Sequence, residues 1–235
     1  MTLKETLDEL EGYGDDTIKK IYLNHGVREP LFGVRVQDLK KIVKKVKKNH
    51  RLSLGLYKTG NSDAMYLAGL IADENEISKS ELQTWVENAT NRGISEYTVA
   101  WVAAESKYGY ELGLKWIESN EELIATAGWS TLSNYAAITP DEKLDIDKYS
   151  ELLERIEKGI HDAPNRVRYT MNGFVIAVGS YIIDLDEKAL RIAKNIGKVK
   201  VNVGDTACKV PFAIDSINKV KEKGKQGRKR KKARC

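Results

Sequence analysis

The sequence predicts an all-α fold in which antiparallel helix pairs stack into a solenoid. Apolar residues recur at intervals of three and four, as in LKKIVKKV at 39–46, where one face is apolar and the other is rich in lysine. Connections between such segments are short, about two to six residues except over 139–147. The segments pair at intervals of about 35–45 residues, near the length of a HEAT-type repeat. We therefore expect about six such pairs, with a compact helical bundle as the alternative.

The N-terminal helices are predicted from their amphipathic pattern. The opening segment, MTLKETLDELEGYGDD, is acidic and amphipathic. A later helix places its lysines opposite its apolar stripe, and Asn61-Ser62-Asp63 supplies the start signal for the helix that follows. We expect four helices before this signal, over 2–11, 14–25, 35–49 and 51–59.

The later helices carry further start signals. The segments 78–81, 119–122 and 139–142 each have the Ser or Thr and the Glu of a capping box, and Pro164 opens another helix. The segment VKVNV at 199–203 resembles a strand, but it is too short to found a sheet. We expect helices over 62–73, 78–90, 94–106, 109–118, 120–137, 147–161, 164–181 and 185–197, and a last one near 211–223.

Charge is distributed unevenly along the 235 residues. The formal net charge is +5, but residues 219–235 hold ten Lys and Arg and one acidic residue, a net charge of +9. The preceding 218 residues therefore carry −4. Because so basic a segment cannot pack a core, we expect one helical domain over 1–223 and a flexible basic tail over 224–235.

Composition excludes several classes of protein. No apolar run of about 18 residues predicts a transmembrane helix, and the acidic N-terminus is unlike a secretory signal or a transit peptide. Cys208 and Cys235 cannot form a disulfide framework, which favours the reducing cytoplasm, and Cys208 is expected to be buried. The three histidines and two cysteines lack the spacing of a metal site. No Walker loop or GxGxxG is present, so we expect no metal, no cofactor and no membrane partner.

Basic segments predict contact with a phosphate backbone, because Lys and Arg displace counterions from nucleic acid without reading its sequence. The tail and the lysine face of 35–48 are two such segments, with a solvated surface or an anionic membrane as the alternative. Two arginines at 166 and 168 follow a helix start, where positive charge opposes the helix dipole unless a phosphate or carboxylate is near. The residues expected to contact phosphate are Lys40, Lys44, Lys45, Lys48, Arg166, Arg168, Lys209, Arg228, Lys229 and Arg230.

Seven tyrosines and tryptophans cluster over 97–135. Aromatic rings can stack on bases, although at helical spacing they more often form core. Trp101 and Trp116 lie among apolar neighbours, so we expect them in the core. Tyr97 and Trp129 sit at helix starts beside polar residues and are expected to face an exposed groove.

The sequence offers one acidic candidate for catalysis beside these aromatics. Glu96 precedes Tyr97, and a carboxylate at such a position could orient water or stabilise a cation. Glu105 is a second acid, on an otherwise apolar helix. For both residues a structural ion pair is the alternative.

Six segments form a set that extends over most of the chain. They are GVRVQDLKKIVKKVKK, NSDAMYLAGLIAD, SEYTVAWVAAES, AGWSTLSNY, APNRVRYTMNGFVIAVGSY and GDTACKVPFAI. Together they resemble bacterial proteins of the DNA alkylation repair family, the AlkD-type HEAT-like repeat proteins, over about residues 20–225. The resemblance is to a branch divergent from the characterised glycosylases.

This resemblance implies a right-handed superhelix of helix pairs with a basic, concave groove for duplex DNA. Active members of the family release cationic 3- or 7-alkylated purines, using a carboxylate to stabilise an oxocarbenium-like sugar and to guide water. Glu96 or Tyr97 falls nearest the family's essential Asp, and Phe174 corresponds best to its later active-site Trp. The stretch ISEYT at 94–98 has neither the Trp pair nor the Asp of those enzymes.

Three hypotheses for function follow. The first is a DNA-binding solenoid that acts as a monofunctional alkylpurine DNA glycosylase, with Glu96 as the acid and with Tyr97, Trp129 and Phe174 lining the site. The second is a non-catalytic scaffold for structured or damaged DNA or RNA. The third is a protein-interaction solenoid whose concave face reads a peptide.

Overall fold

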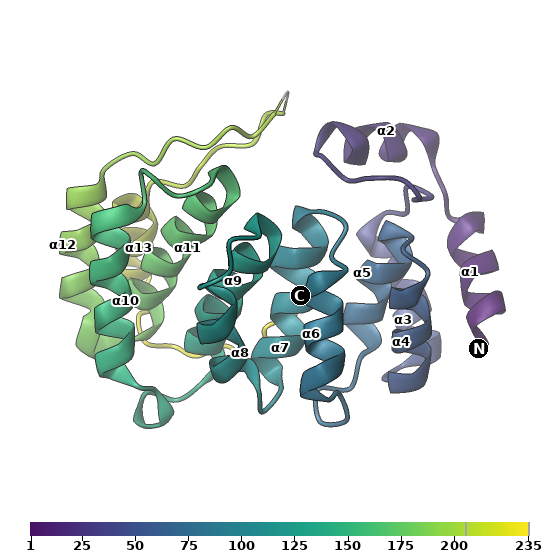
Figure 1. The fold of residues 1–235 in the computed structure, drawn as a ribbon, viewed down its shortest axis with the longest axis horizontal. Coiled ribbons are helices and arrows are strands. Elements are labelled where there is room, and N and C mark those ends of the chain that lie inside the picture. Colours follow the sequence, from purple (N-terminus) through teal and green to yellow (C-terminus); the bar gives the residue numbers. More distant parts are fainter. Residues whose placement is uncertain (205, 235) are drawn as a thin grey trace.

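The computed structural model describes residues 1–204 and 206–234, and every regular element in them is a helix. Thirteen α-helices follow one another through an elongated stack (Figure 1). Each segment predicted to be helical contains an observed helix, so the all-α prediction is confirmed. The strand-like segment 199–203 has no strand partner within the described residues. None of the helices in these ranges combines the length and apolar character needed to cross a membrane.

The helix bounds define the order of the stack. The first half contains α1 (Leu3–Gly12), α2 (Asp16–Asn24), α3 (Val36–Val46), α4 (His50–Lys58), α5 (Ser62–Ile71), α6 (Lys79–Glu87), the π-helix η1 (Ile94–Val99) and α7 (Ala100–Glu105). The second half contains α8 (Gly109–Trp116), α9 (Glu122–Ile138), α10 (Ile146–Gly159), α11 (Asn165–Tyr181), α12 (Asp186–Ile196) and α13 (Ala213–Glu222), with 3-10 turns at Asp141–Lys143 and Ile183–Leu185.

One of the three predicted capping boxes is present. Ser78 and Glu81 satisfy each other's backbone N–H groups at the start of α6. Ser119 instead accepts from the N–H of Glu121, ahead of α9, so it does not cap that helix. The 139–142 segment starts only the single 3-10 turn. Sequence spacing alone does not decide whether the backbone before the helix has the direction that the cap requires.

The helices form two alternating rows. One row consists of α4, α6, α8, α10 and α12, and the other contains α5, η1 with α7, α9 and α11, which we call the α5–α11 row. Helices that are consecutive in the chain pack as pairs, as α4 does with α5 and α8 with α9. Within the α5–α11 row, each helix also packs against the next. This alternation is the architecture of a HEAT-like solenoid.

The close contact between α5 and η1 depends on a glycine. A Cβ atom at Gly69 would lie 2.7 Å from Thr98 Cγ2 and 3.1 Å from its Cα. Because a side chain at this position would collide with the backbone of η1, glycine is what lets the two helices approach each other. The first half of the α5–α11 row is therefore tightly spaced.

Two large hydrophobic cores fill the space between the rows, one in each half of the chain. Trp129 and Phe174 are both fully buried in the second core, with ring centroids 5.2 Å apart in an edge-to-face arrangement. Tyr149 stacks on the other side of Phe174 at 5.4 Å. The prediction that Trp129 and Phe174 contact a base is therefore wrong, because they pack against each other in the interior. Trp101 and Trp116 are buried, as predicted.

The basic C-terminal segment is packed against the solenoid, unlike the flexible tail that the sequence predicts. Residues 224–234, which we call the C-terminal strap, cross the C-terminal ends of four helices in turn. The N–H of Gly227 bonds Ser180 of α11 at 2.9 Å, and the N–H of Arg230 bonds Ala137 of α9 at 2.7 Å. Helix C-termini expose unpaired carbonyls and a negative dipole end, so a cationic segment is complementary to them.

Arg234 anchors the far end of the strap. Its guanidinium donates to Glu105 of α7 at 2.7 Å, to the carbonyl of Ala72 after α5 at 2.7 Å, and to Glu74. Glu105 also accepts the N–H groups of Ala233 and Arg234, which confirms its alternative role as a structural ion-pair partner. The Arg234 and Glu105 side chains are each only 7% exposed, so this pair is shielded from water.

Removal of the Arg234 charge is expected to destabilise the fold. Replacing one partner of a buried ion pair leaves the other uncompensated, so Arg234→Gln should lower the free energy of unfolding by about 3 kcal/mol. Thermal unfolding should show a melting temperature lower by roughly 6–12 °C. The matched control is Lys232→Gln, which removes an exposed strap cation and should change stability by less than about 0.5 kcal/mol. Equal melting temperatures for the two variants would contradict the anchoring role.

Candidate nucleic-acid interface

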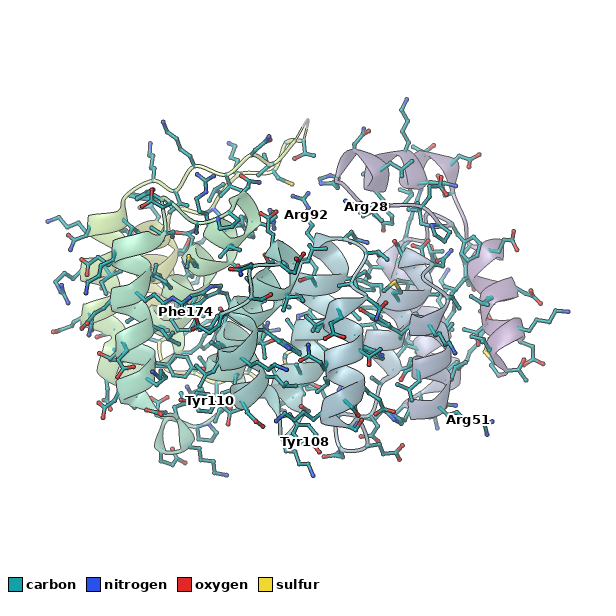
Figure 2. All side chains as sticks on the ribbon, viewed as in Figure 1. Arg28, Arg51, Arg92, Tyr108, Tyr110 and Phe174 are labelled. Atoms are coloured by element: carbon teal, nitrogen blue, oxygen red, sulfur yellow. The ribbon has the colours of Figure 1, made fainter. Side chains whose placement is uncertain are left out.

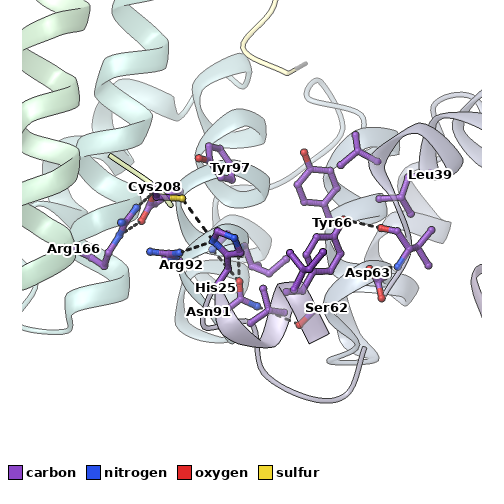
Figure 3. A pocket seen from close by; sticks show the side chains of 18 of the residues that line it. His25, Leu39, Ser62, Asp63, Tyr66, Asn91, Arg92, Tyr97, Arg166 and Cys208 are labelled. Carbon is purple, nitrogen blue, oxygen red and sulfur yellow. Dashed lines mark hydrogen bonds and ion pairs between the residues drawn. The ribbon is translucent and has the colours of Figure 1, made fainter. Parts of the chain in front are cut away.

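An open cleft of about 430 Å³ lies where the N-terminal ends of the α5–α11 row meet α2 and the segment 197–212. Residues from five parts of the chain line it (Figure 3). The walls are mainly apolar and aromatic, and the charged groups are few. The lining side chains include Tyr22, His25, Asp63, Tyr66, Arg92, Glu96, Tyr97, Arg166, Tyr169 and Cys208.

One wall of the cleft is positioned by a buried carboxylate. Asp63, in the first turn of α5, accepts the backbone N–H groups of residues 32, 33 and 34 at 2.6, 2.9 and 3.1 Å. Burial raises the pKa of the Asp63 carboxyl, and these three donors oppose that rise. Gly33 has a φ of +82°, and a Cβ there would lie 2.5 Å from the Asp15 carbonyl oxygen. Asp63 and Gly33 together hold the loop that carries α2 over the end of α5.

One side of the cleft holds a two-pronged ion pair between α11 and η1 (Figure 3). Nε and Nη2 of Arg166 donate to Oε1 and Oε2 of Glu96 at 2.7 and 2.6 Å. Glu96 is 4% exposed. Burial raises the pKa of the Glu96 carboxyl, while the guanidinium opposes that rise. Both carboxylate oxygens are engaged, so Glu96 has a positive counter-charge in direct contact.

Arg166 makes two further contacts at the same helix end. Its backbone N–H donates to Glu122 at the start of α9, at 2.6 Å. Its guanidinium carbon lies 4.0 Å from the ring centroid of Tyr169. The arginine therefore joins η1, α9 and α11 at the edge where their N-termini meet. An internal carboxylate, Glu96, resolves the unfavourable placement of this positive charge near a helix start.

Glu96 and Tyr97 are neighbours in the π-helix, but one is buried and the other is exposed. Glu96 points inward to Arg166, while Tyr97 is 44% exposed at the cleft. The Tyr97 ring lies 5.3 Å from the ring of Trp101, which in turn meets Tyr66 edge-on at 5.7 Å. Burial of one side raises the pKa of Tyr97, so its phenol is neutral at pH 7. Tyr97 thus confirms the expectation of an exposed aromatic at this helix start.

Polar side chains close the side of the cleft near α2. Nη2 of Arg92 lies 3.5 Å from Nδ1 of His25, and Sγ of Cys208 lies 3.8 Å from the same nitrogen (Figure 3). Asn91 holds the start of η1 by accepting the N–H groups of residues 93 and 94. Cys208 is exposed, so the prediction of a buried cysteine is wrong: it lies on a surface segment instead of in a core.

The rim of the cleft is basic. Arg92 lines the cleft and Arg28 lies at the same edge of the molecule, whereas Arg51 lies at the opposite edge (Figure 2). The segment 197–212 adds three exposed lysines, and it is tied to α11 by reciprocal hydrogen bonds between Asn165 and Asn202 at 2.8 and 2.7 Å. The three lysines are Lys198, Lys200 and Lys209.

The structure brings together some of the predicted site residues and separates others. Glu96, Tyr97 and Arg166 converge on the cleft, and Lys209 is exposed one residue after its lining residue Cys208. Arg168 is partly buried, and its Nε has no hydrogen-bond partner among the described atoms. The predicted residues Trp129 and Phe174 remain in the core.

The remaining predicted phosphate contacts lie away from the cleft. On α3, Lys45 pairs with Glu9 at 2.7 Å and Lys48 with Glu74, whereas Lys40 and Lys44 are exposed. In the strap, Lys229 is half-buried against Asp141 at 2.6 Å, while Arg228 and Arg230 are exposed. The strap lies at the C-terminal ends of the α5–α11 row, and the cleft lies at the N-terminal ends.

Several cleft residues were not anticipated from the sequence. Asp63 follows a predicted N-cap and therefore carries a signal only for a helix start. Arg92 and His25 lie outside the segments that carry the family resemblance and Tyr66 lies within one, and the three meet only through the fold. No local pattern in the sequence indicates the loop-holding role of Asp63, because its partners lie about 30 positions earlier in the chain.

The stacked helix pairs and the cleft at their aligned ends define the class of HEAT-like repeat proteins. The model of the DNA alkylation repair enzyme family matches residues 6–201. The chain therefore belongs to that family.

Three relatives are similar over essentially the whole chain. An uncharacterized protein of Listeria monocytogenes is 36% identical over 231 residues, which cover 96% of this chain and 100% of the relative. One of Listeria innocua is 35% identical and covers 95% of this chain and 99% of its own. A solved structure is 39% identical with a TM-score of 0.91 and covers 100% of both chains. It is described as a new family of proteins related to the HEAT-like repeat DNA glycosylases with affinity for branched DNA structures.

The Glu96–Arg166 pair is expected to show strong energetic coupling. Either Glu96→Gln or Arg166→Gln leaves a buried partner charge uncompensated, and should lower the free energy of unfolding by about 3 kcal/mol. The double variant should cost clearly less than the sum of the two, as measured by urea unfolding of all four proteins.

An exposed ion pair serves as the matched control for this cycle. Lys79 and Glu111 form a bridge whose side chains are 46% and 64% exposed. Glu111→Gln should cost less than about 1 kcal/mol, because water screens the pair. Strictly additive effects of the Glu96 and Arg166 substitutions would show that the pair contributes no coupling.

Proposed function

We propose that the protein binds branched DNA at the cleft end of the α5–α11 row and does not excise bases there. The observation that carries the non-catalytic part of this proposal is the two-pronged bond between Arg166 and Glu96, which engages both oxygens of the predicted catalytic acid. The remaining features of the cleft suit binding. The protein would act on DNA within the bacterial cytoplasm.

The electrostatics of the cleft favour a phosphate backbone. Arg92 lines the cleft and Arg28 lies at the same edge of the molecule, and three lysines lie on the adjoining 197–212 segment. Contacts of this kind position a nucleic acid without reading its sequence.

The chemistry of base excision fits the cleft poorly. Release of an alkylated purine develops positive charge on the sugar, and a carboxylate aids this step through its unneutralised negative charge. Glu96 is already neutralised by a guanidinium 2.6 Å away, so its field at a nearby sugar is weak. A carboxylate whose two oxygens both accept hydrogen bonds from arginine is also a poor acceptor for a proton from water.

The preference for branched DNA is supported by the relative of known structure. That protein, 39% identical over its full length, is described as having affinity for branched DNA structures. The cleft itself is suited to a bent or opened duplex, since its floor is aromatic and its rim is basic. A straight duplex would present only its phosphates to such a surface.

Loss of the Arg92 charge is expected to weaken DNA binding. Arg92→Ala should raise the Kd for a four-way DNA junction about fivefold to tenfold, and should reduce the slope of log K against log salt by about 1. Fluorescence anisotropy at several salt concentrations measures both quantities. The matched control, Arg51→Ala, removes an exposed arginine at the opposite edge and should leave both unchanged. Equal weakening by both variants would place the DNA elsewhere.

No base release is expected from alkylated DNA. Incubation of the protein with methylated duplex should liberate neither 7-methylguanine nor 3-methyladenine above the rate without protein, as followed by chromatography. The Glu96→Gln variant should behave identically. Base release that disappears in Glu96→Gln would refute the non-catalytic part of the proposal and would restore Glu96 as a catalytic acid.

A further inference from the structure

We infer that the cleft receives one unpaired nucleobase from the branch point of the DNA, stacked on the exposed face of Tyr97. This inference rests on the proposed function, because it concerns the ligand of the same site. It assigns the chemical class of that ligand, a planar heterocycle with an attached phosphate.

The cleft has the dimensions of a small-molecule site. Its volume of about 430 Å³ falls within the range of cavities that hold a small organic ligand. Such a space accepts a base and its sugar, but it excludes a stacked base pair within an intact duplex. The base must therefore come from a position where pairing is already lost, which a branch point provides at little energetic cost.

The polar groups that line the cleft are mostly committed to the protein itself. Asp63 accepts three backbone N–H groups, and Glu96 accepts two bonds from Arg166. The Asn91 carbonyl accepts two backbone N–H groups, and the Tyr22 hydroxyl donates to the Val34 carbonyl at 3.0 Å. Little hydrogen-bonding capacity remains to distinguish the edges of different bases. Recognition must then come from the faces of a planar ligand.

Tyr97 supplies such a face. Its side chain is 44% exposed although the residue lies between buried neighbours, and Trp101 supports its ring from 5.3 Å away. An aromatic ring held in place by a second ring loses little entropy when a base stacks on it. Every base has a π-face, so the contact tolerates any sequence, as expected of a protein that recognises DNA shape.

Arg92 lies in the position for the phosphate that accompanies the base. It lines the same cleft as Tyr97, and Figure 3 places its side chain beside His25. Unlike the Arg166 guanidinium, which is held by Glu96, the Arg92 guanidinium has a single hydrogen-bond partner among the described residues, the ring nitrogen of His25 at 3.5 Å. A cation next to an aromatic face matches a nucleotide, which joins an anion to a heterocycle.

The test measures the interaction between Tyr97 and one base. Two three-way DNA junctions are compared, one with a single unpaired base at the branch point and one with an abasic analogue in its place. The wild-type protein should bind the first about tenfold more tightly than the second. Tyr97→Ala should bind both with the lower affinity, so the discrimination disappears. Tyr97→Phe, which keeps the ring, should retain the full tenfold difference.

A fluorescent base provides a second readout. 2-Aminopurine at the unpaired position should change its emission on addition of wild-type protein or Tyr97→Phe, but not on addition of Tyr97→Ala. Equal wild-type affinity for the two junctions, or a tenfold difference that persists in Tyr97→Ala, would overturn the inference while leaving branched-DNA binding intact. A wild-type protein that binds neither junction better than a linear duplex would overturn the proposed function, and the inference with it.

Discussion

The shared direction of the helices in the α5–α11 row is the constraint on which the rest of the molecule depends. Because these helices run parallel to one another, their N-termini gather at one edge and their C-termini at the other. Each edge carries partial charges that need partners. Carboxylates such as Asp63 and Glu96 occupy the first edge beside the cleft, and cationic strap residues such as Arg234 occupy the second. The parallel direction of these helices thus accounts for both the position of the cleft and the position of the basic segment.

The fold follows closely from local sequence because each helix pair depends on contacts near in sequence. Apolar residues at intervals of three and four, as in 39–46, decide both that a helix forms and which side it buries. Where the connecting loop is short, a helix must pack antiparallel on its neighbour. The π-helix over 94–99 could not be predicted from this periodicity, because six residues are too few to show a period different from that of an α-helix.

The cleft is less predictable, since its chemistry depends on residues that are distant in the chain. Glu96 and Arg166 are separated by 70 positions, and no local pattern in the sequence pairs one with the other. Trp129 and Phe174 are residue types that often contact bases, but the fold buries both of them in the second core. A tertiary contact likewise reversed the expectation for the C-terminal segment, whose Arg234 finds a buried acid at the end of α7.

The strap also changes how the repeats are connected. In a plain solenoid each repeat touches only its neighbours, so the array behaves as a one-dimensional chain that can fray from either end. Here Arg234 contacts Glu74, a residue 160 positions earlier. Two earlier strap residues, Gly227 and Arg230, bond α11 and α9. This closes a long loop and ties four repeats to one segment. These long-range contacts raise the contact order of the array, so we expect its repeats to unfold more cooperatively and to fold more slowly than those of a plain solenoid.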